Sequence, residues 1–357
     1  MNLEEIIAQI QPIDQAWVDK ARQYVAQLAI PPRALGRLHD MAERLCGIFG
    51  TLEPMVSPKT FLVMAGDHGV VADGVSAFPQ EVTGEMVKNF LRSGAAINAL
   101  ASSVGAEVIV VDMGIIPDVD LSCHETDHLF RSCKVDRGTA NIAHGPAMSR
   151  QQAGQAVLQG FHLAAELFAA GTRLLGTGDM GIGNTTPSAA IGVALTGVSA
   201  DQMVGRGTGI GDEALAKKRE IVQQALAVNQ PDPRDSLEVL AKVGGFEIGG
   251  IAGCILAGAY YRRPVVIDGF ISTAGALVAQ ALCPQVVDYL FAGHCSEEAG
   301  HRKMLAHLGL EPILDLRLRL GEGTGAALAM GIIEGAVRVF QEVLTFEAAG
   351  VSKKVAF

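Results

Sequence analysis

The 357-residue chain has few aromatic side chains, fewer basic than acidic residues and no apolar run that predicts a membrane span. Aromatic residues make up only 5% of it, so we expect a core of Ala, Val, Ile and Leu. The formal net charge of −10 argues against a nucleic-acid partner, because a phosphate backbone needs a basic face. The N-terminus lacks the basic segment and apolar core of a signal peptide. We therefore expect a cytoplasmic protein that binds neither nucleic acid nor membrane.

The six cysteines show no Cys-x-x-Cys spacing. Cys123 and Cys133 lie near His124 and His128, which leaves a zinc site open as an alternative. Zinc ribbons and fingers usually show tighter paired spacing, so we favour reduced cysteines and expect no metal.

The most informative segment is Gly176–Pro187, which carries four glycines within eight residues. A buried strand is expected just before it, at Thr172–Leu175. We expect Thr186 to be the N-cap of the next helix and Pro187 its first residue, because proline has no N–H to leave unpaired there. Free backbone N–H groups ahead of a helix N-terminus favour a phosphate. The segment therefore predicts binding of a phosphorylated small molecule.

The same segment offers an alternative, because Gly176, Gly178 and Gly181 match the dinucleotide fingerprint Gly-x-Gly-x-x-Gly. Asp201 lies about 20 residues further on, as that fingerprint requires. In the fingerprint, however, the helix opens at the glycines themselves, whereas here Gly183–Pro187 delays it. We therefore disfavour an NAD-dependent oxidoreductase.

From Lys59 onward, short apolar strands alternate with glycine-rich turns and amphipathic helices, a pattern typical of an α/β fold with a parallel sheet covered on both faces. The predicted strands are Thr60–Ala65, Glu107–Asp112, Arg173–Gly176, Pro264–Asp268, Asp288–Phe291 and Glu311–Leu316. The predicted helices are Glu81–Val104, Gly154–Ala170, Pro187–Leu195, Glu213–Val228, Phe246–Tyr261, Ser272–Leu282, Ser296–Leu308 and Thr324–Leu344. Residues 1–50 predict two further helices that are separated at Ile30–Arg33.

Each predicted strand ends at glycine together with a carboxylate, a histidine or another polar group. Because ligands bind beyond the carboxyl ends of parallel strands, these ends predict one polar crevice along one edge of the sheet.

Glu322 is the strongest candidate for a general base, since it lies between Gly321 and Gly323 ahead of a predicted helix. A carboxylate in a partly apolar crevice can act as a base with a raised pKa. The alternative is a first-turn glutamate that complements the helix dipole. Asp179 is either a ribose or reaction-centre ligand, or a loop aspartate that bonds its own backbone.

Other polar candidates are less decisive. Asp67 and His68 are more simply explained as loop-orienting residues than as a metal or acid–base pair. Lys218 could be a counter-charge for phosphate or a residue on a solvated helix face, and Arg206 has the same two interpretations. Phe78 and Met86 could sandwich a flat aromatic ligand, or simply anchor their loop.

Taken together, these motifs resemble the nicotinate-nucleotide–dimethylbenzimidazole phosphoribosyltransferases of cobalamin lower-ligand synthesis. The resemblance spans about residues 10 to 345 and is specific in combination. The segments that carry it are Gly66–Val70, Gly74–Ser76, Pro79–Thr83, Gly178–Pro187, Gly205–Gly209, Val266–Phe270, Ala292–Glu297 and Arg319–Gly325.

The resemblance implies transfer of the 5-phosphoribosyl group of nicotinate mononucleotide to 5,6-dimethylbenzimidazole, giving α-ribazole 5′-phosphate and nicotinate. It implies Glu322 as the base and no metal or redox cofactor. The implied ligands of the mononucleotide are Asp179, Gly181, Gly183, Asn184, Thr185, Arg206 and Lys218. The implied acceptor pocket consists of Phe78, Gln80, Met86 and Leu320.

The resemblance also implies a Rossmann-like large domain over residues 59–323, a small helical domain from residues 1–58 and 324–357, and a homodimer. One position departs from the family pattern, which has glutamate where this chain has Asp179. The shorter side chain puts a direct role for Asp179 in doubt and leaves Glu322 the stronger base. Transfer to a different base, and a non-catalytic protein that binds nicotinate mononucleotide, remain as alternatives.

Overall fold

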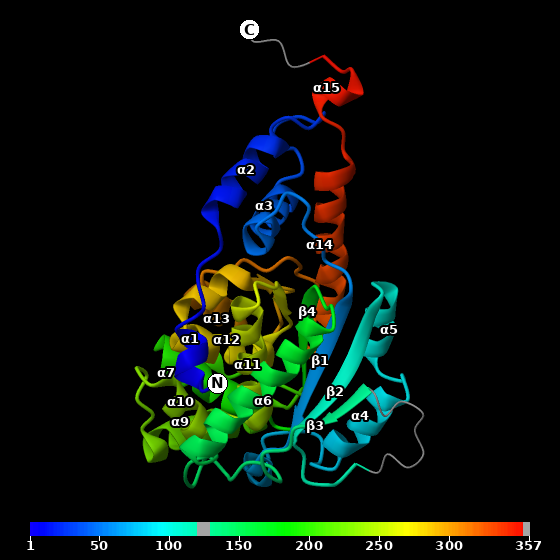
Figure 1. Ribbon diagram of the computed structural model, residues 1–357. Helices are drawn as coiled ribbons and strands as arrows, with labels where there is room; N and C mark the ends of the chain where they lie inside the picture. The colour runs from blue at the N-terminus through cyan, green and yellow to red at the C-terminus, as the bar shows by residue number, and fades with distance from the viewer. Residues whose placement is uncertain (120–128, 353–357) are drawn as a thin grey trace.

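The computed structural model describes residues 1–119 and 129–352, and its centre is a parallel six-stranded sheet in the order β3-β2-β1-β4-β5-β6 (Figure 1). The strands are β1 Lys59–Gly66, β2 Ala106–Gly114, β3 Phe130–Ser132, β4 Leu174–Met180, β5 Val265–Ile267 and β6 Leu290–Ala292. All eight residues of β1 are buried, as expected of a central parallel strand that is covered on both faces. The predicted α/β class and parallel sheet are confirmed.

The prediction of a strand at Glu311–Leu316 is wrong, because this segment makes only one isolated bridge, between His294 and Leu314. Pro312 lies inside it and has no N–H to donate to a ladder. The short strand β3 was not predicted. The other five strands were predicted, with ends that differ by one to four residues, and the largest difference is at β4, which runs on to Met180.

Helices cover both faces of the sheet. α6 (Arg150–Ala169), α11 (Phe246–Tyr260) and α12 (Phe270–Leu282) pack together on one face, where α11 contacts β1, β2 and β4. α5 (Ala96–Ser103) packs on β2, and α14 (Thr324–Glu342) packs on β4 and β5. Glycines bring α6 and α11 into backbone contact. A Cβ at Gly160 of α6 would lie 2.0 Å from the carbonyl oxygen of Gly250 in α11.

The remaining helices are α1 Leu3–Ile7, α2 Gln15–Val25, α3 Arg37–Phe49, α4 Val82–Leu91, α7 Thr185–Thr196, α8 Ala200–Met203, α9 Asp212–Asn229, α10 Ser236–Val243, α13 His301–Leu308 and α15 Phe346–Ala349. Residues 1–50 therefore form three helices rather than two. The predicted helix Glu81–Val104 is two helices, because Ser93 adopts a φ of 58° and Gly94 follows it. α7 begins at Thr185 with Asn184 as N-cap, two residues before the predicted cap at Thr186.

A second, small core joins α2, α3 and the C-terminal part of α14 at one end of the molecule (Figure 1). Its buried members are Ala21, Val25, Ala42, Cys46 and Phe340. This core supports the predicted small domain, whose boundaries stay a prediction. In the part of the chain that is described, no helix has the length and apolar character needed to span a membrane.

Candidate active site

The candidate site lies where the strand order reverses, between the carboxyl ends of β1 and β4, the position at which the sequence predicts a crevice. β1 ends at Gly66 and leads into Asp67 and His68, and β4 ends at Met180 and leads into Gly181. The two ends approach so closely that a Cβ at Gly181 would lie 2.3 Å from the carbonyl oxygen of Gly66. Only glycine fits there, which explains one glycine of the segment from Gly176 to Pro187.

Glu322 reaches this crevice from the turn that precedes α14. Its φ is 64°, and its neighbours Gly321 and Gly323 also have positive φ values, of 87° and 100°. The residue is buried, and its Oε2 accepts a hydrogen bond of 3.3 Å from the backbone N–H of Ile97 in the first turn of α5. A Cβ at Gly178 of β4 would lie 2.2 Å from the Glu322 carbonyl oxygen, so the turn rests directly on the strand.

Burial raises the pKa of Glu322, the hydrogen bond from Ile97 opposes that rise, and the nearby charge of Asp268 adds to it. The observed position agrees with the prediction of a buried carboxylate framed by glycines. A non-glycine residue in the left-handed region costs free energy, and such strain is typical of functional sites.

Asp268, at the end of β5, holds the turn in place. Its Oδ1 accepts hydrogen bonds from the N–H groups of Gly325 (2.7 Å) and Ala326 (3.0 Å), and its Oδ2 accepts one from Gly323 (3.1 Å). This carboxyl group therefore satisfies the first N–H groups of α14 and fixes the backbone beside Glu322. His294 Nε2 lies 3.6 Å from Asp268 Oδ1 on the other side.

Asp179 lies beside the same turn and is buried. Asn184 Nδ2 donates a hydrogen bond of 3.1 Å to Asp179 Oδ2, whereas Oδ1 has no partner among the described residues. Burial raises the pKa of Asp179 well above its usual value, and the charges of Asp268, Glu247 and Glu322 add to the rise. A Cβ at Gly321 would lie 3.1 Å from Asp179 Oδ2, so the structure brings the segment of Glu322 and Asp179 together.

Lys218 and Thr185 form a second polar group at the start of α7. Lys218 Nζ donates a hydrogen bond of 2.6 Å to Thr185 Oγ1. Lys218 is buried, which rules out the solvated helix face that the sequence left open. Burial lowers the pKa of Lys218 to about 8, although Glu298 opposes the shift. Gly207 completes the group, since a Cβ there would lie 3.0 Å from Lys218 Nζ.

Arg206 does not join this group. Its Nη1 donates to the carbonyl oxygen of Ile210 at 2.9 Å, and its Nη2 pairs with Asp212. The guanidinium is half exposed and braces its own loop in this structure.

Chain neighbours of Phe78 and Leu320 contact the segment Gly205–Gly209. The loop before Phe78 contacts it through a 3.0 Å hydrogen bond from Ala77 N to Thr208 Oγ1. Arg319, next to Leu320, donates to the carbonyl oxygen of Gly207 at 3.3 Å. Phe78 and Leu320 are 52% and 58% exposed, unusually high for large apolar side chains, and Met86 is partly buried. Exposed apolar groups beside a polar crevice suit a flat aromatic ligand.

Sequence reasoning missed Glu247, in the first turn of α11. His68 Nε2 and Glu247 Oε1 lie 2.8 Å apart, and both side chains are buried. His68 Nδ1 and Glu247 Oε2 have no partner among the described residues. The available signal was Gly244-Gly245 ahead of Phe246-Glu247, a glycine pair followed by an acid at a helix start.

Two alternatives from the sequence, a dinucleotide site and a zinc site, can be compared with the structure. Gly176 and Gly178 lie inside β4 rather than at a strand-to-helix turn, and a Cβ at Gly176 would lie 2.1 Å from the Phe61 ring. These glycines therefore serve sheet packing, which contradicts the dinucleotide fingerprint. Of the zinc candidates only Cys133 lies within the described residues, and among those residues no group of three or more His, Cys, Asp or Glu could hold a metal ion.

The chain is similar to known proteins in sequence and in fold. A family model described as Phosphoribosyltransferase matches residues 10–351. The nicotinate-nucleotide–dimethylbenzimidazole phosphoribosyltransferase of Geotalea uraniireducens (strain Rf4) is 54% identical over 354 residues, which cover 99% of each chain. The protein of the same name from Geobacter metallireducens is 54% identical over 351 residues, 98% of each chain. A crystal structure of such a phosphoribosyltransferase from Thermus thermophilus has a TM-score of 0.89 and 47% identity, and covers 96% of this chain and all of its own.

Proposed function

The chain belongs to the phosphoribosyltransferase family, and from that premise we infer that it transfers the 5-phosphoribosyl group of nicotinate mononucleotide to 5,6-dimethylbenzimidazole. The products are α-ribazole 5′-phosphate and nicotinate, and the reaction belongs to assembly of the cobalamin nucleotide loop. The observation that carries the residue assignments is Glu322, a buried carboxylate fixed at a positive φ in the crevice between β1 and β4.

The chemistry needs one base. The pyridinium leaving group is already cationic, so it departs as neutral pyridine nitrogen with the electron pair of the glycosidic bond, and no acid is required. The incoming imidazole forms a new bond from its lone-pair nitrogen to the anomeric carbon and must lose the proton of its other nitrogen. Attack from the face opposite the leaving group inverts the β-nucleotide to the α-product. Glu322 accepts the proton, and a raised pKa makes its carboxylate a stronger base than an ordinary glutamate.

Lys218 and Thr185 hold the 5′-phosphate. The N-terminus of α7 supplies backbone N–H groups and the positive end of a helix dipole, and Gly181, Gly183 and Asn184 lead into it. Lys218 is buried, and its protonated amine can form an ion pair with the phosphate. The phosphate either replaces Thr185 Oγ1 as the hydrogen-bond acceptor of Lys218 or binds beside it. Arg206, now paired with Asp212, contributes only if its loop rearranges on binding.

Asp179 binds the ribose. Its unpartnered Oδ1 lies in the crevice floor next to the turn of Glu322, and its raised pKa keeps a proton available for donation to a ribose hydroxyl. The side chain is one methylene shorter than the glutamate of the family pattern, so the contact is proposed from the buried position of Asp179 beside the Glu322 turn, and proton removal is left to Glu322.

Phe78, Gln80, Met86 and Leu320 form the acceptor pocket. The exposed faces of Phe78 and Leu320 supply apolar area for a benzimidazole. Transfer to a different base remains the second candidate, because these exposed side chains can adapt to acceptors of different size.

We further propose that the enzyme is a homodimer in the cytoplasm. The resemblance to its family supports the dimer, and the free state of Cys46, Cys133, Cys254, Cys283 and Cys295 fits a reducing compartment. Sedimentation equilibrium of the purified protein tests the dimer, and a monomer at micromolar concentration contradicts it.

Mass-spectrometric product analysis tests the function. Purified protein is mixed with nicotinate mononucleotide and a panel of bases led by 5,6-dimethylbenzimidazole, and a ribosylated product with released nicotinate is expected. Glu322→Gln should still bind the mononucleotide and lose turnover by about 10²–10⁴-fold, the usual contribution of a general base. Glu342→Gln, at the exposed C-terminal end of α14, the helix that follows Glu322, is the matched control. Absence of product with every base, in folded protein, favours the binding-only alternative.

A further inference from the structure

Lys218 and Glu298 are two buried side chains of opposite charge that lie against the same residue, Gly207. Glu298 Oε1 accepts a hydrogen bond of 2.8 Å from the Gly207 N–H. A Cβ at Gly207 would lie 3.0 Å from Lys218 Nζ, and a Cβ at Gly205 would lie 2.0 Å from Glu298 Oε2. The Glu298 carboxylate therefore packs directly on the segment Gly205–Gly209, beside the amine of Lys218.

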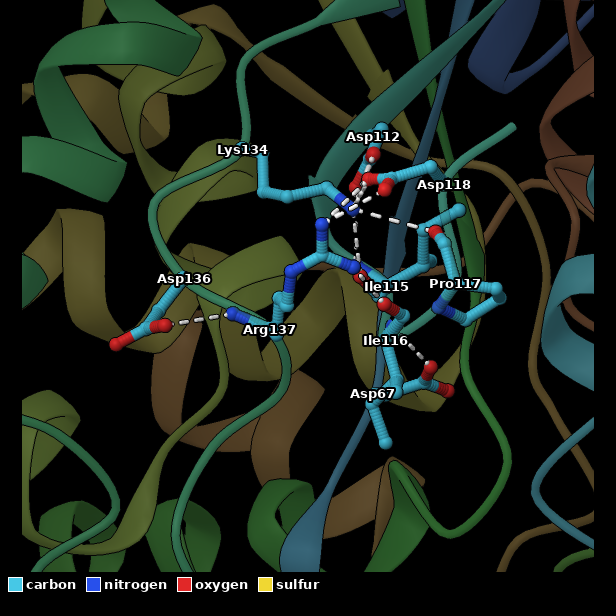
Figure 2. Close-up of polar contacts among 9 residues, drawn as sticks. All are labelled: Asp67, Asp112, Ile115, Ile116, Pro117, Asp118, Lys134, Asp136 and Arg137. Carbon is cyan, nitrogen blue, oxygen red and sulfur yellow. Dashed lines mark hydrogen bonds and ion pairs between the residues drawn. The ribbon is translucent and has the colours of Figure 1, made fainter. Parts of the chain in front are cut away.

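The amine of Lys218 has fewer acceptors than that of Lys134, the partly buried lysine in Figure 2. Oxygen atoms of two backbone carbonyls and two carboxylates surround Lys134 Nζ. They belong to Ile115 (2.8 Å), Pro117 (3.2 Å), Asp112 (3.2 Å) and Asp118 (3.6 Å). Lys218 Nζ donates only to Thr185 Oγ1 among the described residues, although an ammonium group carries three N–H donors. Two donors of Lys218 are therefore left for a ligand, and a phosphate oxygen suits them.

Glu298 supplies the charge that acts on Lys218. Burial lowers the pKa of Lys218 to about 8, and the negative charge of Glu298 opposes this shift. The helices that pack on α9 are α7, α8 and α10. α7 has no acidic or basic side chain, Asp201 of α8 is exposed, and Glu238 and Lys242 of α10 pair with each other. On α9 itself, the residues three and four positions from Lys218 are apolar, namely Ala214, Leu215, Ile221 and Val222.

Three groups favour the ionised form of Glu298. Burial raises its pKa, but the charge of Lys218, the hydrogen bond from Gly207 and the charge of Arg319 oppose that rise. Arg319 Nη1 also donates to the carbonyl oxygen of Gly207 at 3.3 Å. Glu298 and Arg319 therefore bind the N–H and the C=O of one residue, which fixes the backbone beside Lys218.

We propose that Glu298 is a positioning residue of the phosphate site, which fixes the segment Gly205–Gly209 through the Gly207 N–H and keeps the Lys218 amine protonated for the 5′-phosphate. A buried amine tends to lose its proton, and a nearby carboxylate counteracts that tendency. A neutral amine forms no ion pair with phosphate. This inference rests on the proposed function, because it concerns the phosphate of nicotinate mononucleotide.

Glu298→Gln tests the charge, because glutamine keeps an oxygen that can accept the Gly207 N–H. The measurement is the dissociation constant of nicotinate mononucleotide, determined by isothermal titration calorimetry from acidic to alkaline pH. Lys218 should lose its proton at lower pH in this variant, so the pH above which binding weakens should fall by about one unit. The phosphate completes its own ionisation near about pH 6 and does not cause this weakening. An unchanged pH dependence overturns the proposal.

Glu298→Asp separates the charge from the hydrogen bond. Aspartate keeps the charge but is one methylene shorter, so its contact with Gly207 weakens. We expect weaker binding at every pH, with the weakening at alkaline pH still centred near the pKa of Lys218, about 8. If Glu298→Asp shifts this pH as far as Glu298→Gln does, the charge is not what matters and the proposal is wrong.

The Lys218→Arg background shows whether the effect passes through Lys218. Arginine stays charged at all the pH values measured, so adding Glu298→Gln to Lys218→Arg should leave the pH dependence of binding unchanged. A shift equal to that of Glu298→Gln alone means that Glu298 acts on another group, and this result contradicts the proposal.

Asp112→Asn is the matched control, because it removes a buried carboxylate beside a different lysine, Lys134 (Figure 2). It should leave the pH dependence of mononucleotide binding unchanged, and a shift as large as that of Glu298→Gln overturns the proposal. Binding and product formation are measured separately. If the original protein binds the mononucleotide but ribosylates no base, the proposed function fails and the binding series still decides the role of Glu298. If it forms product and Glu298→Gln leaves the pH dependence unchanged, only this inference fails.

Discussion

At the scale of single residues, the site depends on carboxyl groups whose protonation is set by burial. Glu322 and Asp179 lie in the same crevice, yet only Glu322 is hydrogen-bonded to a helix N-terminal N–H, and only Asp179 has an oxygen left without a partner among the described residues. These different environments are the basis for proposing different roles for the two residues, with Glu322 as the proton acceptor and Asp179 as a ribose ligand.

The first prediction concerns the acid side of the pH profile. A general base works only when deprotonated, and the pKa of Glu322 is raised by burial. The turnover number should therefore begin to fall, as the pH is lowered, at a value above the ordinary range of a glutamate. Steady-state kinetics over the acidic and neutral pH range measure where the turnover number begins to fall. A turnover number that stays constant down to the usual glutamate pKa contradicts the role of Glu322.

The second prediction concerns the alkaline side. Lys218 has its pKa lowered to about 8, so it loses its charge as the pH rises through that value. Specificity for nicotinate mononucleotide, measured as kcat/KM, should fall above pH 8, because the phosphate then faces a neutral amine. Lys218→Arg stays charged and should remove this limb.

Lys217→Arg, a change at the exposed neighbouring lysine, should leave the alkaline limb in place and serves as the control. If kcat/KM of Lys218→Arg still falls above pH 8, the fall belongs to another group.

Candidate site residues in glycine-rich segments could be picked out from the sequence. Residues whose contacts depend on how distant segments pack could not. Glu322 and Asp179 lie in glycine-rich segments and Lys218 follows one, and the structure buries all three, whereas their roles stay predictions. Glu247 is 179 positions along the chain from its partner His68, and no local pattern predicts that pairing. The three hydrogen bonds that Asp268 accepts from backbone N–H groups could not be predicted either, because they depend on where α14 packs against β5.

At the scale of elements, strand β4 and the turn before α14 are fitted to each other. The turn has three consecutive residues with positive φ, and it rests on Gly178, where no Cβ has room. Gly178 of β4 therefore leaves the room that the turn of Glu322 occupies, whereas Gly176 leaves room for the ring of Phe61.

The third prediction follows from this contact. Gly178→Ala places a methyl group 2.2 Å from the Glu322 carbonyl oxygen, so the turn must move. Turnover should fall by at least about tenfold, because catalytic geometry tolerates displacements of well under 1 Å. Gly154→Ala in α6, where a Cβ meets nothing within 4 Å, should leave turnover unchanged and raise the unfolding free energy by about 0.5–1 kcal/mol. If both variants have the same turnover, the close contact between Gly178 and the Glu322 turn does not matter for catalysis, and the prediction is wrong.

Elements with a regular period were predicted well, and those defined by distant partners were not. β1, β2 and the long helices α6, α9, α11 and α14 follow local apolar patterns, and their ends were placed within a few residues. β3 has only three residues and exists because it pairs with β2, whereas Glu311–Leu316 has a strand-like composition and pairs at a single bridge. Strand pairing depends on the assembled sheet. Composition alone therefore misses β3 and wrongly predicts a strand at Glu311–Leu316.

At the scale of the whole molecule, two cores of unequal size meet along α14. The first turns of α14 pack against the sheet, where a Cβ at Gly293 would lie 2.8 Å from the Cα of Ala326, and its last turns carry Phe340 into the small core. One helix therefore connects the turn of Glu322, the proposed base, to the N-terminal helices.

The last prediction tests whether the small core is a separate cooperative unit, as the division at residues 58 and 324 requires. Phe340 is buried with its ring centre 5.0 Å from that of Tyr24, and Phe340→Ala should cost about 3–5 kcal/mol within this core. Hydrogen exchange should then quicken in α2, α3 and the last turns of α14, while β1 and β4 stay protected. Leu175→Ala in β4 is the converse control and should quicken exchange in the sheet. If Phe340→Ala speeds exchange equally in the sheet and in α2 and α3, the two cores unfold together and the predicted domain division is wrong.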